Sequence, residues 1–425
     1  QLTEMEFESA RYDELDDMTA TTGVAFLGLS VGCARCHDHK FDPIPTKDYY
    51  RLAAAFTTTI RSEIKLALPT SPEPILVQVN SEGYPHVKHH ADGRGYPHFY
   101  PETHQLTRGD VHQKGVVAES SYLQVLMRDG KQTDFWQQSP PAAWDRTSFR
   151  RASLSTWLTD PEYGAGQLAA RVMVNRIWQH HFGKGLVATP NDFGLQGQPP
   201  SHPELLDWLA RDLIANDWKI KRLHKLIMTS QVYQQSSAVN PKNLKGDPEN
   251  TWLSRWKPRR LEAEAIRDSM LAVSGLLDRR MYGPGDLNEA MRRRSIYFFI
   301  KRSKLIPMMM LFDWPEHLVS IGARATTTTA PQALLFLNNP EARKYAEGFA
   351  PGLKGQPAQD AVAVAFRQVL TRQPSDQERQ AAVAFLWSQQ AVHGGAGKND
   401  AQAIAAAQAD LCQALLSMNE FVYLE

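Results

Sequence analysis

The chain has 425 residues, and its 47 basic side chains nearly balance its 46 acidic ones, which gives a formal net charge of +1. With 42% hydrophobic and 22% charged residues, it has the composition of a globular protein with ample core material, and its length predicts two or three domains. The balanced charge, with no basic stripe, argues against nucleic acid as a partner. No run of about 18 apolar residues predicts a transmembrane segment.

The N-terminal stretch is polar and acidic. It lacks the basic and then apolar residues of a secretory signal peptide, and it does not begin with Met. We therefore expect the chain to be a processed or truncated piece of a longer precursor.

Residues 1–60 are predicted to be mainly helical. The apolar stretch 21–30 leads into a pair of cysteines, and the segment 45–56 then reads as a short helix. In that helix Thr46 is the expected N-cap, and Tyr49 and Leu52 begin an apolar face with helical spacing.

Residues 61–145 differ in character, because Pro and Gly become frequent and the segments 74–79 and 121–126 resemble strands between turns. The tetrapeptide Gly-Tyr-Pro-His at 83–86 recurs at 95–98. This stretch also holds six of the 14 histidines, namely His86, His89, His90, His98, His104 and His112. We interpret 61–145 as a β-rich module or insertion.

Residues 146–350 are predicted to form a helical core domain. The segment 166–182 reads as a helix that stops at Gly183. Capping boxes are expected at Ser201 with Glu204 and at Thr329 with Gln332. A short apolar strand is expected at 295–300.

Residues 351–425 are predicted to form a C-terminal helical segment. Residues 351–359 have the composition of a linker, and a capping box of Ser375 with Glu378 opens one of two further helices. The fold class expected for the chain is therefore mainly α with a β-rich insertion (α+β).

Cys33, Cys36 and His37 have the C-x-x-C-H spacing of c-type haem attachment. On a helical turn, positions i, i+3 and i+4 share a face, so two thiols can reach the two vinyl groups of one porphyrin edge while the imidazole reaches the iron. Three cysteines and 14 histidines produce this motif by chance in on the order of one chain in a thousand. The expected cofactor is haem c, with His37 as the proximal ligand of the iron, and residues 1–60 form its attachment segment.

Three other interpretations of the cysteine pair remain open. A zinc site needs four ligands, and only His39 lies close by. A thioredoxin-like redox pair would need a βαβ context, which is absent, and a structural disulfide would leave His37 without a role. Cys412, in a helical stretch, is interpreted as a buried small apolar residue.

The sixth haem ligand decides whether the haem transfers electrons or reacts with a substrate. His39 is too close to His37 to reach the opposite face of the porphyrin. His181 shares a helix face with apolar residues and is the candidate for this ligand. On the same helix Arg171 is a candidate contact to a haem propionate or to a ligand, although interdomain packing also explains this face.

The segment 28–44, GLSVGCARCHDHKFDPI, resembles the signature of the planctomycete-type cytochrome c-like proteins. The segments 103–110, 170–210, 259–278, 293–302 and 331–340 are also similar to this family of large secreted proteins from Planctomycetes and Verrucomicrobia. Its two characteristic regions are both domains of unknown function. The resemblance covers most of residues 10–425, but the helical N-terminal half of the first region is missing. Also missing is a cysteine that the family carries after the stretch equivalent to Asp313-Trp314-Pro315, where this chain reads Val319-Ser320-Ile321-Gly322.

The resemblance implies a cytochrome c-like haem-binding segment followed by a larger helical domain. It also implies a periplasmic monohaem protein whose partner is a redox protein or a carbohydrate-derived substrate, because such genes tend to lie beside genes for polysaccharide degradation, some for sulfated sugars. If the protein is an enzyme, it is expected to be a haem-dependent oxidoreductase. Two alternatives are a non-haem metal-dependent enzyme using Cys33, Cys36, His37 and His39, and a glycan-binding module in the β-rich part.

Overall fold

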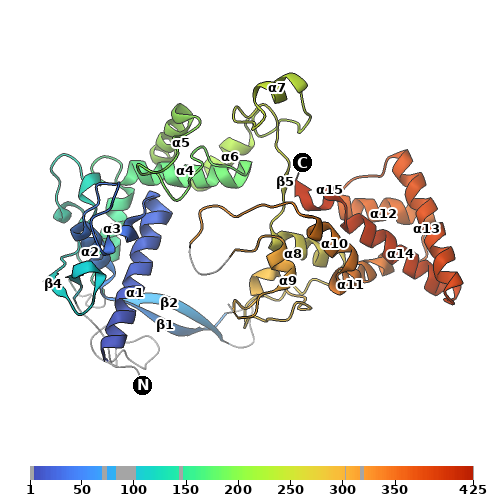
Figure 1. Ribbon diagram of the computed structural model, residues 1–425, viewed down its shortest axis with the longest axis horizontal. Helices are drawn as coiled ribbons and strands as arrows, with labels where there is room; N and C mark the ends of the chain where they lie inside the picture. Colours follow the sequence, from blue (N-terminus) through green and yellow to red (C-terminus); the bar gives the residue numbers. More distant parts are fainter. Residues whose placement is uncertain are drawn as a thin grey trace. The chain divides into compact units, whose positions relative to one another are not determined.

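The computed structural model describes residues 4–68, 74–82, 102–142, 147–301, 303–315 and 320–424. Contacts within the chain divide it into two compact units (Figure 1). Unit 1 comprises Gln1–Gln235 and Lys242–Ser254, and unit 2 comprises Ser236–Pro241 and Arg255–Glu425. The predicted division at 60, 145 and 350 into independent domains stays a prediction.

Helices predominate, and the strands of the described residues form small antiparallel pairs, so the structure is α+β with a helical majority. The helices that lie mainly in unit 1 are α1 (Glu4–Thr22), α2 (Thr46–Ala53), α3 (Arg150–Thr159), α4 (Gly166–Phe182), α5 (Pro203–Ala215), α6 (Ile220–Met228) and α7 (Pro241–Gly246). Its strands are β1 (Thr59–Leu66), β2 (Ile75–Glu82), β3 (His104–Leu106) and β4 (Lys114–Val117). None of the helices within these described ranges is long and apolar enough to cross a membrane.

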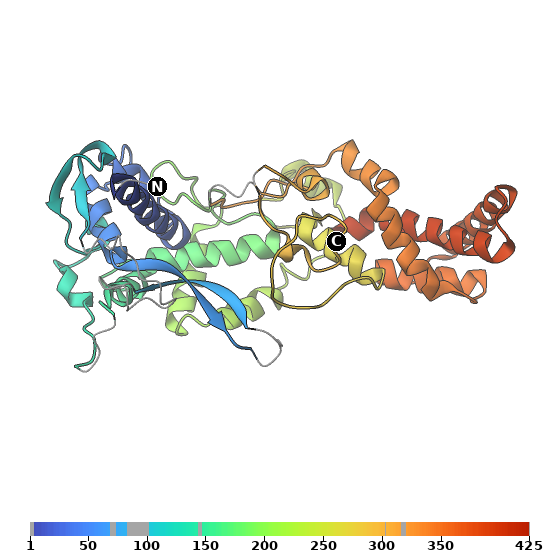
Figure 2. The same cartoon turned by 90° about the horizontal axis from the view of Figure 1, so that it is seen from below.

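The stretch predicted to be β-rich contains two antiparallel hairpins in its described residues. Strands β1 and β2 pair antiparallel from Thr59 opposite Glu82 to Leu66 opposite Ile75, and β3 pairs with β4 in a second hairpin. Helix α1 lies along the start of the first hairpin (Figures 1 and 2), where Arg11 donates hydrogen bonds to the carbonyl oxygens of Phe56 and Thr57. The repeated Gly-Tyr-Pro-His lies outside the described residues.

The strand predicted at 121–126 is wrong. Tyr122 and Leu123 are buried as a strand pattern requires, but the chain then turns into a 3-10 helix at Gln124–Leu126. A residue distant in sequence explains this turn. The buried carboxylate of Asp48 accepts a hydrogen bond from the Gln124 N–H at 2.8 Å.

Helix ends in unit 1 are predicted partly correctly. Helix α4 ends at a left-handed Gly183 (φ 82°), as expected. The predicted capping box at Ser201 is wrong, because α5 begins at Pro203 and the Ser201 hydroxyl donates to the carbonyl oxygen of Leu186 instead. Thr46 is the first residue of α2 rather than its cap, and its N–H donates to the carboxylate of Asp38 at 2.8 Å.

The core of unit 1 has two buried clusters. One joins α1, the cysteine segment, α2 and α3, with Tyr122 stacked on Trp157 at a ring distance of 5.0 Å. The other joins α4, α5 and α6. The cysteine segment therefore belongs to a packed core and is not a peripheral loop.

Unit 2 is a helical array around one buried cluster that runs from Ala263 to Val422. Helices α13 and α14 pack against each other along their lengths (Figure 2). The helices of unit 2 are α8 (Ala263–Val273), α9 (Pro307–Leu311), α10 (Ala330–Asn338), α11 (Pro340–Phe349), α12 (Ala358–Leu370), α13 (Asp376–Gly395), α14 (Asp400–Leu416) and α15 (Asn419–Val422). The strands of unit 2 are β5 (Arg259–Arg260) and β6 (Tyr423–Leu424).

In unit 2, the elements predicted from local sequence signals were correct at some positions and wrong at others. The capping boxes at Thr329 and Ser375 are both present. The strand predicted at 295–300 is wrong, because the carboxylate of Asp268 accepts hydrogen bonds from the N–H and the hydroxyl of Ser295, and a 3-10 turn forms there. The predicted linker contains a 3-10 helix whose Leu353 is fully buried.

Candidate functional site

The cysteine motif is held in place by glycine and by helix α4. After α1 the chain passes through a π-turn, reverses at Gly28 (φ 59°) and enters a 3-10 turn, Val31–Arg35. A Cβ at Gly28 would lie 2.6 Å from the ring of Phe193, whose N–H donates to the Gly28 carbonyl at 2.7 Å. Arg176 of α4 donates to the carbonyl of Val24 at 2.9 Å. Only glycine satisfies both the positive φ and this close approach.

Cys33, Cys36 and His37 all lie at the surface of this turn. Both cysteines are free and exposed, and His37 is exposed, whereas Ala34 between them is fully buried. The predicted helical turn is a 3-10 helix at Val31–Arg35, with Cys36 as its C-cap and His37 after it. The outcome that matters for chemistry is that both thiols and the imidazole are accessible together.

A hydrogen bond sets the tautomer of His37. Its Nδ1 lies 2.7 Å from the carbonyl oxygen of Asp38. Because a carbonyl oxygen can only accept, Nδ1 carries a proton, and in the neutral ring the lone pair is on Nε2. An imidazole fixed in this way is the form that binds a metal through Nε2.

His39 has the opposite environment and is a structural residue. Its side chain is 5% exposed, and its Nδ1 accepts hydrogen bonds from the N–H groups of Asp42 (2.8 Å) and Phe41 (3.3 Å). Nε2 therefore carries the proton and donates it to the Ser30 hydroxyl at 3.0 Å. Both ring nitrogens are engaged, so His39 cannot join Cys33, Cys36 and His37 around an ion without breaking the loop.

Asp42 connects the motif to the chain that follows α4. Its buried carboxylate lies 3.6 Å from the His39 Nδ1 and accepts a hydrogen bond from the Leu195 N–H at 2.8 Å. A Cβ at Gly194 would lie 2.5 Å from the Asp42 carboxylate oxygens. The loop after α4 therefore closes directly on the loop that carries His37.

Charged and phenolic groups hold the inner side of the motif. Arg35 forms ion pairs with Asp13 (2.8 Å) and Asp16 (3.3 Å) of α1, and Tyr49 donates to Asp16 at 2.6 Å. Tyr50 donates to the carbonyl of Arg35 at 2.9 Å, and burial raises the pKa of Tyr50 to about 12. Both phenols therefore stay protonated at neutral pH and keep donating.

The turn before β4 packs on the second cysteine. Gly109 (φ 75°) comes so close that a Cβ there would lie 2.8 Å from the Sγ of Cys36. Residues 73 positions apart in sequence thus meet at the thiol. Sequence reasoning missed Gly109, although it lies within the segment 103–110 that carries the family resemblance.

His181 and Arg171 have partners of their own in α4's surroundings. The Nε2 of His181 lies 2.7 Å from the Nδ1 of His224 in α6, and its ring packs edge-on against Tyr233. Arg171 forms an ion pair with Asp207 of α5 at 2.7 Å, and this hydrogen bond lowers the pKa of Asp207. The roles expected for His181 and Arg171 at a haem stay predictions.

The remaining polar and aromatic residues on that helix face serve packing. Asn175 is fully buried and exchanges two hydrogen bonds with the backbone of Val187. Trp178 is buried and stacks on Phe182 at 4.3 Å. These contacts fix the turn that follows α4.

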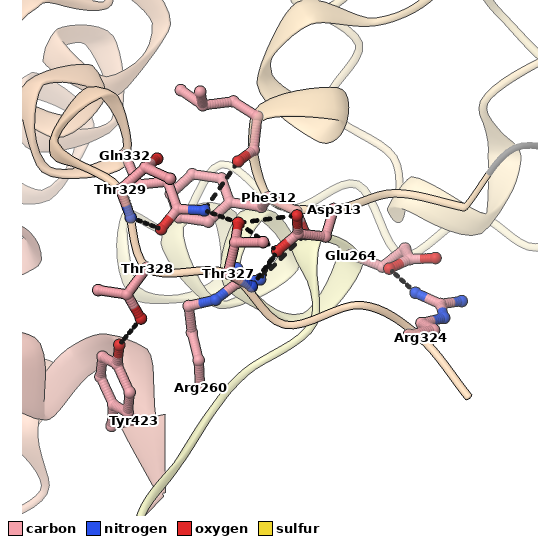
Figure 3. A network of polar contacts seen from close by, with 11 residues as sticks. Arg260, Glu264, Phe312, Asp313, Arg324, Thr327, Thr328, Thr329, Gln332 and Tyr423 are labelled. Atoms are coloured by element: carbon pink, nitrogen blue, oxygen red, sulfur yellow. Dashed lines mark hydrogen bonds and ion pairs between the residues drawn. The ribbon is translucent and has the colours of Figure 1, made fainter. Parts of the chain in front are cut away.

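Unit 2 contains a second polar cluster, around Arg260 (Figure 3). Arg260 pairs with Asp313 at 2.5 Å, and Thr327 donates to the same carboxylate. Arg260 is 8% exposed and Arg267 is fully buried, so neither guanidinium lies at the surface.

Arg267 donates to the carbonyl oxygens of Glu289, Met291 and Arg293, and burial lowers its pKa. Its donors therefore tie the segment 289–295 to α8.

Glu264 is also paired with other side chains of unit 2 (Figure 3). Burial alone would raise its pKa, but a hydrogen bond from Arg324 at 2.6 Å and another from the Trp314 indole outweigh burial, and the pKa is lowered. The cluster joins α8 to the loop before α10. We assign it a structural role.

In the described part of the chain, the cysteine motif included, side chains alone form no metal-binding cluster. In those ranges no group of three or more His, Cys, Asp or Glu side chains could hold a metal ion. Cys412 is buried as expected, and burial raises the pKa of its thiol to about 12, so the thiolate is suppressed at neutral pH.

Comparison with known proteins matches both parts of the chain. Residues 150–386 match the family model PSD1, described as a protein of unknown function (DUF1553), and residues 1–61 match PSCyt2, described as a protein of unknown function (DUF1549). Searches among curated proteins and solved structures found no match. The two models are the two adjoining regions that the sequence resembled, so this prediction is confirmed.

Proposed function

Because the chain belongs to the PSD1 (DUF1553) family and carries a PSCyt2 (DUF1549) region, we propose that it is a haem c protein working outside the cytoplasm. Cys33 and Cys36 bind the porphyrin covalently, and His37 is the proximal ligand. The protein exchanges electrons with a redox partner or oxidises a carbohydrate-derived substrate in polysaccharide breakdown.

The observation that carries the proposal is the tautomer of His37. Its Nδ1 proton is donated to the Asp38 carbonyl, so the neutral ring has its lone pair on Nε2, and the two cysteines of the same motif are free and exposed. This donor set fits a covalently attached porphyrin with one axial imidazole. It does not fit the non-haem centre considered from the sequence, because His39 has no nitrogen to offer.

The residues around the motif would each have a definite task. Bound haem supplies a one-electron redox centre. His37 holds the iron and is oriented by the Asp38 carbonyl. Arg35 and Tyr50 fix the backbone between the two thiols through their contacts with α1 and with each other. His39 and Asp42 brace the loop on which His37 stands.

The test is covalent haem itself. The chain is exported in cells that attach c-type haem, then analysed by pyridine haemochrome spectrum and intact mass. We expect one haem per chain, lost in Cys33→Ser with Cys36→Ser and retained in Cys412→Ser, the matched control with a buried thiol. Wild-type protein that folds and is exported without haem contradicts the proposal.

A further inference from the structure

The hairpin β3–β4 contacts the motif most closely at the sulfur atom of Cys36. Gly109, in the turn between its strands, faces the Sγ of Cys36 with no room for a side chain. A porphyrin joined to this sulfur would have its attachment edge next to the turn. Within the described residues, the turn is therefore a segment outside the motif that lies close enough to meet the porphyrin.

This turn is held firmly. The Thr107 N–H donates to the Gln113 carbonyl (3.0 Å), and the Asp110 N–H donates to the Thr107 carbonyl (3.1 Å). Leu106 at its base is buried in the same core as the motif. On α1, the Tyr12 hydroxyl accepts a hydrogen bond from the His104 N–H at 2.8 Å. The backbone of the turn thus has a fixed position relative to Cys36.

His112 stands on this turn with an accessible ring. Its backbone N–H donates to the Asp110 carboxylate at 2.9 Å, and its side chain is exposed. It follows Gly109 by three residues, so the two Cα atoms are at most about 11 Å apart. By contrast, His39 has both nitrogens engaged, and His181 shares a hydrogen bond with His224.

We infer that His112 is the sixth ligand of the haem. The inference rests on the proposed function, because it needs the haem at Cys33 and Cys36. If His37 holds the iron, a sixth ligand would have to come from another segment of the chain that lies close to the motif. The turn at Gly109 is such a segment, and His112 is its imidazole. Two axial histidines make a low-spin haem of lower potential than a His/Met pair.

The experiment compares the haem-loaded wild type with His112→Ala, His112→Met, and the controls His104→Ala and His181→Ala. Haem content is measured by pyridine haemochrome, spin state by the visible and electron paramagnetic resonance spectra, and the midpoint potential by redox titration. His112→Ala is expected to keep its haem but to become high-spin, and added imidazole is expected to restore the low-spin spectrum. His112→Met is expected to stay low-spin with a raised potential, and both controls should match the wild type.

Other outcomes distinguish the assignment of His112 from the proposed function. Haem in every variant with an unchanged spectrum in His112→Ala overturns the assignment of His112 and leaves the proposed function standing. A spin change in His104→Ala or His181→Ala alone assigns the ligand to that histidine and also overturns the inference. Wild-type protein without haem removes the proposed function, and the inference falls with it.

Discussion

Gly109→Ala tests the contact between the β3–β4 turn and Cys36. The added Cβ would lie 2.8 Å from the thiol sulfur, at least about 0.6 Å closer than ordinary van der Waals contact. Gly109 also has φ 75°, a left-handed conformation that costs an L-residue about 1–2 kcal/mol. Overpacking adds about 1–3 kcal/mol, so we expect unit 1 to lose about 2–5 kcal/mol.

Gly130→Ala is the matched control. Gly130 is also left-handed (φ 67°), but a Cβ there would meet nothing within 4 Å. This variant is expected to lose only the backbone cost of about 1–2 kcal/mol, so the difference between the two variants isolates the contact with sulfur.

Two assays follow the perturbation. Urea denaturation monitored by tryptophan fluorescence measures the loss of stability. Mass spectrometry after timed alkylation of the haem-free protein measures access to Cys36, and Gly109→Ala is expected to change the alkylation rate at Cys36 and not at Cys412. Equal destabilisation of the two variants, with an unchanged rate at Cys36, would refute the packing of the turn on the thiol.

Three further predictions concern stability. His39→Ala is expected to destabilise unit 1 by about 1–3 kcal/mol because it removes the acceptor of two backbone hydrogen bonds, from Phe41 and Asp42. His37→Ala, at an exposed position, should change the urea midpoint little; equal midpoints would count against a bracing role for His39. Arg267→Met is expected to destabilise unit 2 by about 3–5 kcal/mol, because it leaves buried carbonyl groups without a hydrogen-bond donor. Thermal unfolding would measure this loss, with Arg279→Met, at an exposed position, as the control. The hydrogen bond from Arg372 lowers the pKa of Glu378 from 4.5 to about 2, so the stability that Glu378 contributes is complete above pH 4.5 and disappears as the pH falls towards 2. Glu378→Gln should flatten this part of a stability profile measured between pH 5 and 2, and an unchanged slope would contradict it.

Local sequence signals were sufficient where neighbours in the chain decide the structure. Helix α4 and its stop at Gly183 follow from spacing and from the need for a left-handed residue at its end. The boxes at Thr329 and Ser375 formed because each pair of side chains satisfies N–H groups within one turn.

Local signals failed where a distant group competes for the same backbone. Asp48 turns the segment at Gln124 away from a strand, and Asp268 does the same at Ser295. Ser201 could cap α5, but the Leu186 carbonyl takes its hydroxyl. The periodicity of apolar residues in the sequence does not reveal such distant hydrogen-bond partners.

The candidate site, too, could be predicted from the sequence only in part. The spacing of Cys33, Cys36 and His37 was visible in the sequence, because the chemistry requires those residues to be close. The difference between His37 and His39 was not, since it depends on which backbone groups each ring meets. Gly109 could be found only once folding had brought it to Cys36.

The bonds that support the motif from α4 and the following loop have a consequence for biosynthesis. Arg176 and Leu195 reach back over 152 and 153 residues to Val24 and Asp42. On a chain synthesised from its N-terminus, both thiols exist before these partners have been made. Under the proposed function, an attachment enzyme could therefore meet the motif before α4 and its following loop hold it.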